Sequence, residues 1–98
     1  MILVLGSVVV QDGRVDEALR VSLEHVHRSR AEPGCVSHAV YRDAENSQRL
    51  VFVEQWSDQA ALAEHFKVPA SRQFVKALGA LAAQPPAMTI YAAEQLQL

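Results

Sequence analysis

Apolar and polar residues follow one another in patterns that predict a strand, a helix and a second strand in the first half of this chain. Residues 1–10 carry valine, leucine and isoleucine on both alternating faces, which is typical of a strand covered on both sides. From residue 14 to residue 31 the apolar side chains recur at helical spacing. Glu32-Pro33-Gly34 ends this helix, because proline and then glycine cannot continue it. Residues 36–43 alternate as a strand.

The second half of the chain repeats this order. The polar residues 44–47 form a hairpin loop, and 48–56 has the pattern of the next strand. Ser57 or Asp58 is expected to cap the helix that follows, because either side chain can accept a hydrogen bond from its first turn. Pro69 interrupts this helix, so that its apolar face continues in a second helical segment.

That second segment extends to Leu81 and stops before Pro85-Pro86, and residues 88–93 form a short last strand. The element order is therefore β-α-β-β-α-β. Right-handed crossovers turn this order into a ferredoxin-like α+β fold, with a four-stranded antiparallel sheet and both helices on one face. We expect residues 1–98 to form a single domain.

The predicted sheet has an apolar face that its own helices cannot cover. Alternation leaves Leu3, Leu5 and Val9 of the first strand on that side, together with Val51 and Val53. A contiguous apolar patch of this kind is larger than soluble monomers usually expose. We therefore predict a homodimer in which the open faces of two sheets pack together.

One strand and the helix after it carry the main candidate chemistry. Phe52, Glu54 and Trp56 share a face of the strand, because alternate residues point to the same side. His65 lies on the inner stripe of the following helix and can fold back over that face. A carboxylate beside an imidazole in apolar surroundings is a usable acid/base pair. The alternatives are a buried structural hydrogen bond, or a His65 side chain that reaches solvent.

Aromatic and histidine side chains are candidates for the wall of a binding pocket, although such side chains more often belong to the core. These residues are Phe52, Trp56, His25, His38, Phe74 and Tyr41. His27 is expected on the solvent side of the first helix. Cys35 is expected to be a small buried filler, because no basic neighbour lowers its pKa.

Charge and composition narrow the classes of partner. The chain has 9 basic and 11 acidic residues with neither sign clustered, which argues against nucleic acid or an anionic membrane as partner. The longest apolar run, residues 1–10, is too short to span a bilayer and lacks the features of a secretory signal. These features predict a cytoplasmic location. The single cysteine excludes an internal disulfide and a thiolate metal cluster.

Several cofactor motifs are missing from the sequence. It has no glycine-rich phosphate loop, no HExxH or CxxC pair and no Gly-x-Ser-x-Gly elbow. The four histidines are scattered without i,i+4 pairing, which is weak evidence for a metal. We therefore expect neither a nucleotide nor a metal cofactor.

Two motifs resemble the antibiotic biosynthesis monooxygenase family, within the dimeric α/β-barrel superfamily. They are Glu32-Pro33-Gly34-Cys35 and Phe52-x-Glu54-x-Trp56-x-Asp58-x-x-Ala61-Leu62-x-x-His65. The resemblance covers nearly the whole chain in element order and length. It implies a cavity between sheet and helices in each protomer, and dimerisation through the sheets.

The resemblance also implies oxygenation without a cofactor. A quinol-like or aromatic polyketide-like substrate, once deprotonated, can itself give an electron to O₂, so the protein supplies a base, an oriented flat substrate and a dry cavity. His65 would be the base, Glu54 its orienter or a second acid, and Trp56 with Phe52 the stacking wall.

Haem cleavage is not expected, although some relatives perform it. Those relatives carry an axial histidine about where Val75 stands, and an asparagine near Gly6-Ser7. Two other functions stay open on the same scaffold. One is an isomerase or degradative enzyme for a small carbonyl compound, and the other is a ligand-binding or stress-associated dimer without turnover.

Overall fold

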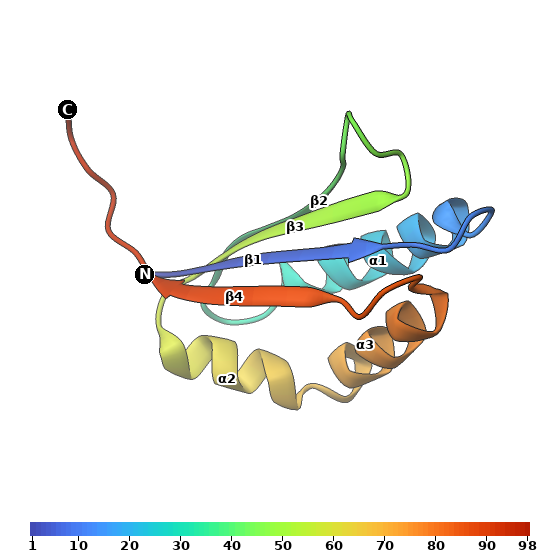
Figure 1. The fold of residues 1–98 in the computed structure, drawn as a ribbon. Coiled ribbons are helices and arrows are strands. Elements are labelled where there is room, and N and C mark those ends of the chain that lie inside the picture. The colour runs from blue at the N-terminus through green and yellow to red at the C-terminus, as the bar shows by residue number, and fades with distance from the viewer.

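The structure of the protein, a computed structural model, describes residues 1–98 as four strands and three helices (Figure 1). In chain order these elements are β1 (Ile2–Val9), α1 (Val15–Ser29), β2 (Cys35–Arg42), β3 (Arg49–Trp56), α2 (Gln59–Lys67), α3 (Pro69–Leu81) and β4 (Ala87–Ala92). The strands form one antiparallel sheet in the order β2-β3-β1-β4. All helices pack on the same face of this sheet, so the predicted ferredoxin-like α+β fold is confirmed.

The end of α1 differs from the expectation by two residues. The helix stops at Ser29, because the backbone N–H groups of Ala31 and Glu32 donate to carbonyls only three residues back. This tightened turn precedes Pro33, whose ring disfavours a helical conformation in the residue before it. The turn therefore places Glu32 outside the helix, where its side chain can face α2.

The second helical region begins and divides where the sequence predicted. Asp58 is the cap of α2, and its Oδ1 accepts a 2.8 Å hydrogen bond from the backbone N–H of Ala61. A single extended residue, Val68, separates α2 from α3. Pro69 is then the first residue of α3, a position where its missing N–H costs nothing.

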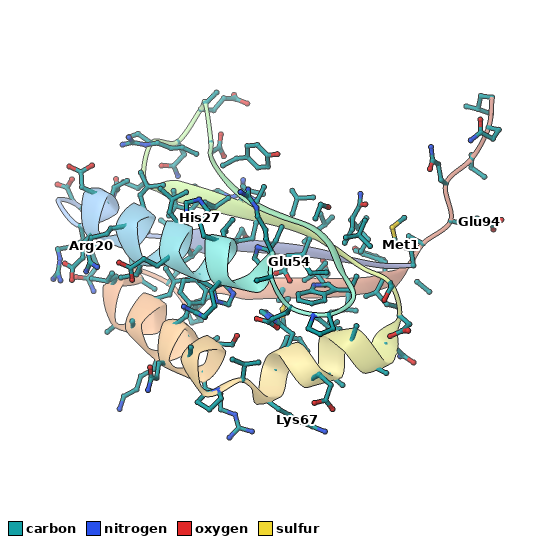
Figure 2. The ribbon with its side chains drawn as sticks, turned by 180° about the vertical axis from the view of Figure 1, so that it is seen from behind. Met1, Arg20, His27, Glu54, Lys67 and Glu94 are labelled. Carbon is teal, nitrogen blue, oxygen red and sulfur yellow. The ribbon has the colours of Figure 1, made fainter.

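Two groups of buried apolar side chains lie between the sheet and the helices. The larger group, here called the apolar core, consists of Val8, Val10, Val15, Ala18, Leu50, Phe52, Leu78 and Leu81. The smaller group consists of Ile2, Val4, Trp56 and Leu62. Along β3, Glu54 lies between Phe52 of the first group and Trp56 of the second, and it is itself only 8% exposed. Figure 2 shows Glu54 between sheet and helices.

The other face of the sheet has no helix over it. Cross-strand pairing puts Leu3 opposite Tyr91, and Tyr41 opposite Val51, so these side chains share that open face. Leu5 is 39% exposed there, Tyr41 58% and Tyr91 49%. The expected apolar open face is thus present. No helix of the chain has the length and apolar character needed to cross a membrane.

Candidate functional site

A cavity of about 580 Å³ lies between the sheet and the helices. This volume is within the usual range of small-molecule pockets, roughly 300–1,000 Å³. Its walls come from all three helices, from β1 and β3, and from the start of β4. The aromatic part of the wall consists of Phe52, Phe66 and Phe74. The buried polar side chains that reach the cavity are His25, Glu54, His65 and Ser71.

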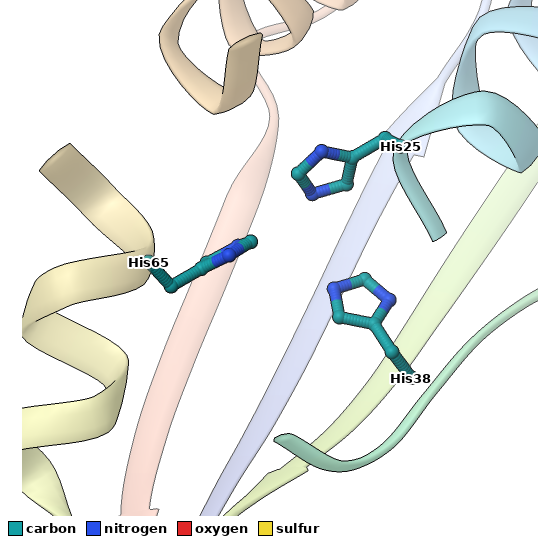
Figure 3. Close-up of side chains that lie close together, drawn as sticks. All are labelled: His25, His38 and His65. Carbon is teal, nitrogen blue, oxygen red and sulfur yellow. The ribbon is translucent and has the colours of Figure 1, made fainter. Parts of the chain in front are cut away.

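Three histidines meet beside this cavity and are here called the imidazole cluster. His25 comes from α1, His38 from β2 and His65 from α2, and Figure 3 shows their rings turned toward one another. One ring nitrogen of each lies within 4.8 Å of the others, and none of the residues is more than 4% exposed. These histidines are scattered in the sequence, and they meet because the fold joins the segments that carry them.

His65 is held by a carboxylate that the sequence had assigned only to a turn. Its Nδ1 lies 2.8 Å from Oε1 of Glu32. An ionised carboxylate can only accept, so Nδ1 carries the proton and Nε2 is left with its lone pair free. His65 is 4% exposed and lines the cavity. A neutral imidazole oriented by a carboxylate in this way is the arrangement of a general base.

The turn that carries Glu32 is fixed by a glycine. Gly34 has φ +82°, in the left-handed region that glycine adopts without strain. A Cβ at this position would also overlap the Cβ of Ala61 in α2. The carbonyl of Gly34 accepts a 2.8 Å hydrogen bond from the N–H of Ser57. The Glu32-Pro33-Gly34 turn is therefore seated against α2, which brings the carboxylate of Glu32 to His65.

Glu54 is paired within its own strand. The indole Nε1–H of Trp56 donates a 2.9 Å hydrogen bond to Oε1 of Glu54, and Nε2 of His38 lies 3.2 Å from the same oxygen. Burial alone would raise the pKa of Glu54, but His38, Trp56 and His65 around it together lower that pKa below its ordinary value. Glu54 is therefore a carboxylate at neutral pH and gives the cluster a negative charge.

His38 has the least satisfied ring of the three. It is 1% exposed, and neither of its ring nitrogens makes a hydrogen bond. Its contact with Glu54 is close in distance, 3.2 Å, but does not have the alignment of a hydrogen bond. Buried polar atoms without a partner are rare in folded proteins, so this ring calls for an explanation beyond packing.

His25 is held between an aromatic ring and an arginine. Its ring stacks on Phe74 with 4.0 Å between centroids and 7° between planes. Nη2 of Arg28 lies 2.9 Å from its Nδ1, and a guanidinium can only donate, so Nδ1 accepts. Burial, with His38, His65 and Arg28 nearby, lowers the pKa of His25 from 6.5 to about 3. His25 is therefore neutral at physiological pH.

Several of the expected site residues reach the cavity, but their partners differ from the expectation. Phe52, Phe74, His25, Glu54 and His65 all line it. The hydrogen bond of His65 goes to Glu32, whereas Glu54 bonds to Trp56 and lies beside His38. The expected direct pair of Glu54 with His65 is therefore replaced by two separate carboxylate–imidazole contacts.

Two expected wall residues lie elsewhere. Trp56 is fully buried and does not line the cavity; its ring lies behind His65, with 4.6 Å between centroids. Tyr41 points to the open face and is 58% exposed, because it is one residue beyond the inward-facing set that contains His38. Trp56 was expected in the stacking wall and Tyr41 in the wall of a binding pocket, but neither side chain lines the cavity. His38 lies in the imidazole cluster behind the cavity surface.

The two residues that hold the imidazoles were not predicted. Glu32 was identified only in a helix stop and in a family motif, and Arg28 was not singled out. Helical periodicity does not encode the contact of Glu32, because 33 residues separate it from His65. The contact of Arg28 with His25 spans three residues of α1. Arg28 also donates a 3.2 Å hydrogen bond to the carbonyl of Ala70 in α3, so it joins α1 to α3.

Two remaining expectations concern His27 and Cys35. His27 is exposed, as expected. Cys35 is a free thiol that is partly rather than fully buried, and it packs against the smaller apolar group. Burial raises the pKa of the Cys35 thiol, and the carboxylates of Glu32 and Glu54 add to that rise. Cys35 is thus a poor nucleophile at neutral pH.

Comparison with known proteins identifies relatives over most of the chain. Residues 1–77 match the family model described as antibiotic biosynthesis monooxygenase. The uncharacterized protein sll1783 of Synechocystis sp. is 33% identical over 96 residues, which make up 98% of this chain and 65% of that protein. The chain therefore spans slightly less than two thirds of the length of this relative.

Solved structures share the fold closely. A crystal structure of an antibiotic biosynthesis monooxygenase is 25% identical, with a TM-score of 0.89 over 97% of this chain and 100% of that chain. Rv0793 from Mycobacterium tuberculosis is 27% identical, with a TM-score of 0.86 over 97% of this chain and 96% of that one. The similarity thus extends through β4, beyond the residues that the family model matches.

Proposed function

Because the chain belongs to the antibiotic biosynthesis monooxygenase family, we propose that it is a monooxygenase for a quinol-like or aromatic polyketide-like small molecule. The single observation that carries this proposal is the pair of His65 and Glu32 at the edge of a cavity with an aromatic wall. The pair supplies a base, and the wall supplies flat apolar surface on which an aromatic ring can lie.

The reaction needs no reductant other than the substrate. Nε2 of His65 takes the proton of a substrate hydroxyl, and the resulting phenolate is electron-rich enough to give an electron to O₂. One oxygen atom then forms a new C–O bond, and the other leaves as water with two hydrogens from the substrate. A hydroquinone and O₂ give a hydroxyquinone and water in this way, and the quinol supplies every electron. His65 is 4% exposed, so bulk water has little access to the base.

Glu32 and Glu54 have different roles in this proposal. Glu32 holds His65 in the tautomer that leaves Nε2 free, and it stabilises the imidazolium that forms after proton transfer. Glu54 is already bonded by Trp56 and stays a carboxylate, so it adds negative charge near the imidazoles without taking the proton. Glu32 is therefore a positioning residue for the base.

The proposal is tested by oxygen uptake with a panel of hydroquinones. We expect His65→Gln to lower the turnover rate roughly 10²–10⁴-fold, the usual contribution of a general base. Glu32→Gln should lower the rate by about tenfold or more, because the amide no longer fixes the tautomer or stabilises the imidazolium. Glu64→Gln is the matched control: it lies on the exposed side of α2, paired only with Lys67, and should leave uptake unchanged.

Three outcomes would contradict the oxygenase proposal. They are no uptake with any hydroquinone, full activity in His65→Gln, and conversion of a carbonyl substrate that continues without oxygen. The last of these would support an isomerase on the same scaffold. Circular dichroism of each variant confirms that a loss of rate is not a loss of fold.

The open sheet face supports a second part of the proposal, a homodimer. Apolar side chains of four strands share this face, and Leu5, Tyr41 and Tyr91 are all more than a third exposed on it. At roughly 25 cal/mol per Å², covering several hundred Å² of such surface favours association by many kcal/mol before the cost of ordering. Light scattering at micromolar concentration should give the mass of two chains, and Leu5→Lys should give the mass of one. A monomeric mass for the unaltered chain would contradict the dimer.

A further inference from the structure

The proposed oxygenation uses one imidazole, yet the fold buries three. His25 and His38 have no part in the proton transfer assigned to His65, although both are at most 4% exposed and come from different elements of the fold. We propose that His25, His38 and His65 form a binding site for one divalent first-row transition-metal ion. Such a site goes beyond the proposed oxygenation.

The positions of the nitrogens are close to those of a three-histidine site. One nitrogen from each ring lies within 4.8 Å of the other two. In a tetrahedral site with zinc–nitrogen distances of about 2.0–2.1 Å, neighbouring nitrogens are roughly 3.4 Å apart. The rings therefore need to approach one another by at most about 1.4 Å. The three side chains extend into the same space between the elements that carry them (Figure 3).

His38 gives the second, independent indication of a ligand. Both of its nitrogens lack a hydrogen-bond partner although the residue is 1% exposed. Nδ1 of His38 loses its bond to water without replacement, and Nε2 keeps only the 3.2 Å contact with Glu54, which disfavours the folded protein. A metal ion bound to His38 supplies a partner for one of these two nitrogens. Since the ring faces His25 and His65, the same ion can reach all three.

The groups around the cluster suit a cation. Glu32 bonds to Nδ1 of His65 at 2.8 Å, which leaves Nε2 for a metal and reproduces the carboxylate–histidine–metal arrangement of known sites. Glu54 places a carboxylate oxygen 3.2 Å from Nε2 of His38, so it can neutralise charge or serve as a fourth ligand. Imidazole donors favour zinc, iron, cobalt, nickel or copper over calcium or magnesium, which prefer oxygen.

Arg28 is the one group that opposes the metal. It donates to Nδ1 of His25, which requires the proton of the neutral ring to be on Nε2. For Nε2 to bind a metal, that proton must move to Nδ1 and Arg28 must release the ring. Arg28 can do so while it keeps its hydrogen bond to the carbonyl of Ala70. Arg28→Met, which removes the competing donor, should therefore bind the metal more tightly.

The experiment is a metal titration of the full chain after treatment with a chelator and without substrate. Co²⁺ is followed by its visible absorption and Zn²⁺ by calorimetry. We expect one ion per chain, with a dissociation constant in the micromolar range or below. His38→Ala should weaken binding at least tenfold. His25→Phe should do the same while its phenyl ring keeps the stack on Phe74, so one of the two variants remains informative if the other misfolds.

The matched control is His27→Ala, which removes an exposed histidine from the same helix as His25 and should leave the titration unchanged. Three results would overturn the proposal: no stoichiometric binding of either ion, unchanged binding in folded His38→Ala and His25→Phe, or equal loss in His27→Ala. Oxygen uptake is measured separately with chelator present. A failed titration therefore leaves the oxygenase proposal intact, and absent uptake leaves the metal site intact.

Discussion

The apolar core and the imidazole cluster occupy the same face of one sheet but are built on opposite principles. The apolar core joins Val8, Val10 and Leu50 to the helices through side chains with no polar atoms. The imidazole cluster buries three rings and a carboxylate whose hydrogen bonds are only partly satisfied. The first region stabilises the fold through area removed from water, and the second keeps reactive groups dry at some cost in stability. The predictions below test this division.

The largest effect is expected in the apolar core. Leu50 is fully buried there, so Leu50→Ala removes apolar contacts and leaves a void. We expect a loss of about 2–5 kcal/mol in the free energy of unfolding. Urea denaturation followed by circular dichroism measures this loss. A change below 1 kcal/mol would mean that the core does not carry the stability assigned to it.

A somewhat smaller effect is expected at the turn that serves the cluster. Gly34→Ala puts a side chain in the left-handed region and against Ala61, which should cost about 3 kcal/mol. The same change should move Glu32 away from His65 and slow oxygen uptake. Gly13→Ala is the control, because Gly13 also has a positive φ, 77°, but an added Cβ there meets no atom within 4 Å. Equal rates in both variants would show that strain, and not the position of Glu32, matters.

Acid should weaken the cluster before it weakens the apolar core. The folded-state pKa of His25 is about 3, below its ordinary 6.5, so the unfolded chain takes up the proton first. The stability that neutral His25 provides is complete above pH 6.5 and is lost as the pH falls toward 3. Glu54, whose pKa is also lowered, adds a loss of the same sign below about pH 4.5.

This dependence is measured on the chelator-treated protein. Between pH 8 and pH 5 we expect the free energy of unfolding to fall by about 2 kcal/mol. The fall begins near pH 6.5, and each further pH unit costs about 1.4 kcal/mol. His25→Phe should remove that part of the fall and keep the part below pH 4.5. A profile that is flat down to pH 5 in the unaltered protein would contradict the assignment of a neutral His25.

The smallest effect is expected at His38. His38→Leu replaces a ring without hydrogen bonds by an apolar side chain of comparable size. Without metal, we expect the free energy of unfolding to fall by about 1 kcal/mol or less, because the lost contact with Glu54 is poorly aligned and Glu54 keeps its hydrogen bond from Trp56. Chemical denaturation of His38→Leu and Leu50→Ala under the same conditions compares the two free energies of unfolding directly. A loss above 2 kcal/mol would show that His38 is retained for the fold.

The fold was predictable from the sequence because the pattern of apolar residues that determines it is periodic. Alternation in residues 1–10 and 48–56, together with helical spacing in 14–31, specifies which side of each element is buried. The breaks at Pro33 and Pro69 are local, so they too were readable. The largest difference in bounds is at the last turn of α1, where hydrogen bonds shift from four residues back to three.

Only part of the candidate site was predictable, because the rest depends on tertiary contacts. The face shared by Phe52 and Glu54 follows from alternation, as does the inward position of His65. Nothing periodic brings Glu32 to His65, since that contact depends on how one turn is seated against α2. Trp56 was assigned to a stacking wall because its ring suits that role, but its indole is used to hold Glu54.

Trp56 has a further use, because it is the only tryptophan of the chain. Its ring is fully buried, bonded to Glu54 and 4.6 Å from the ring of His65. A proton or a cation that arrives at these imidazoles therefore changes the electric field at the sole indole. The molecule thus contains its own fluorescent reporter at the place where its chemistry is proposed, and emission can be followed without attaching a dye.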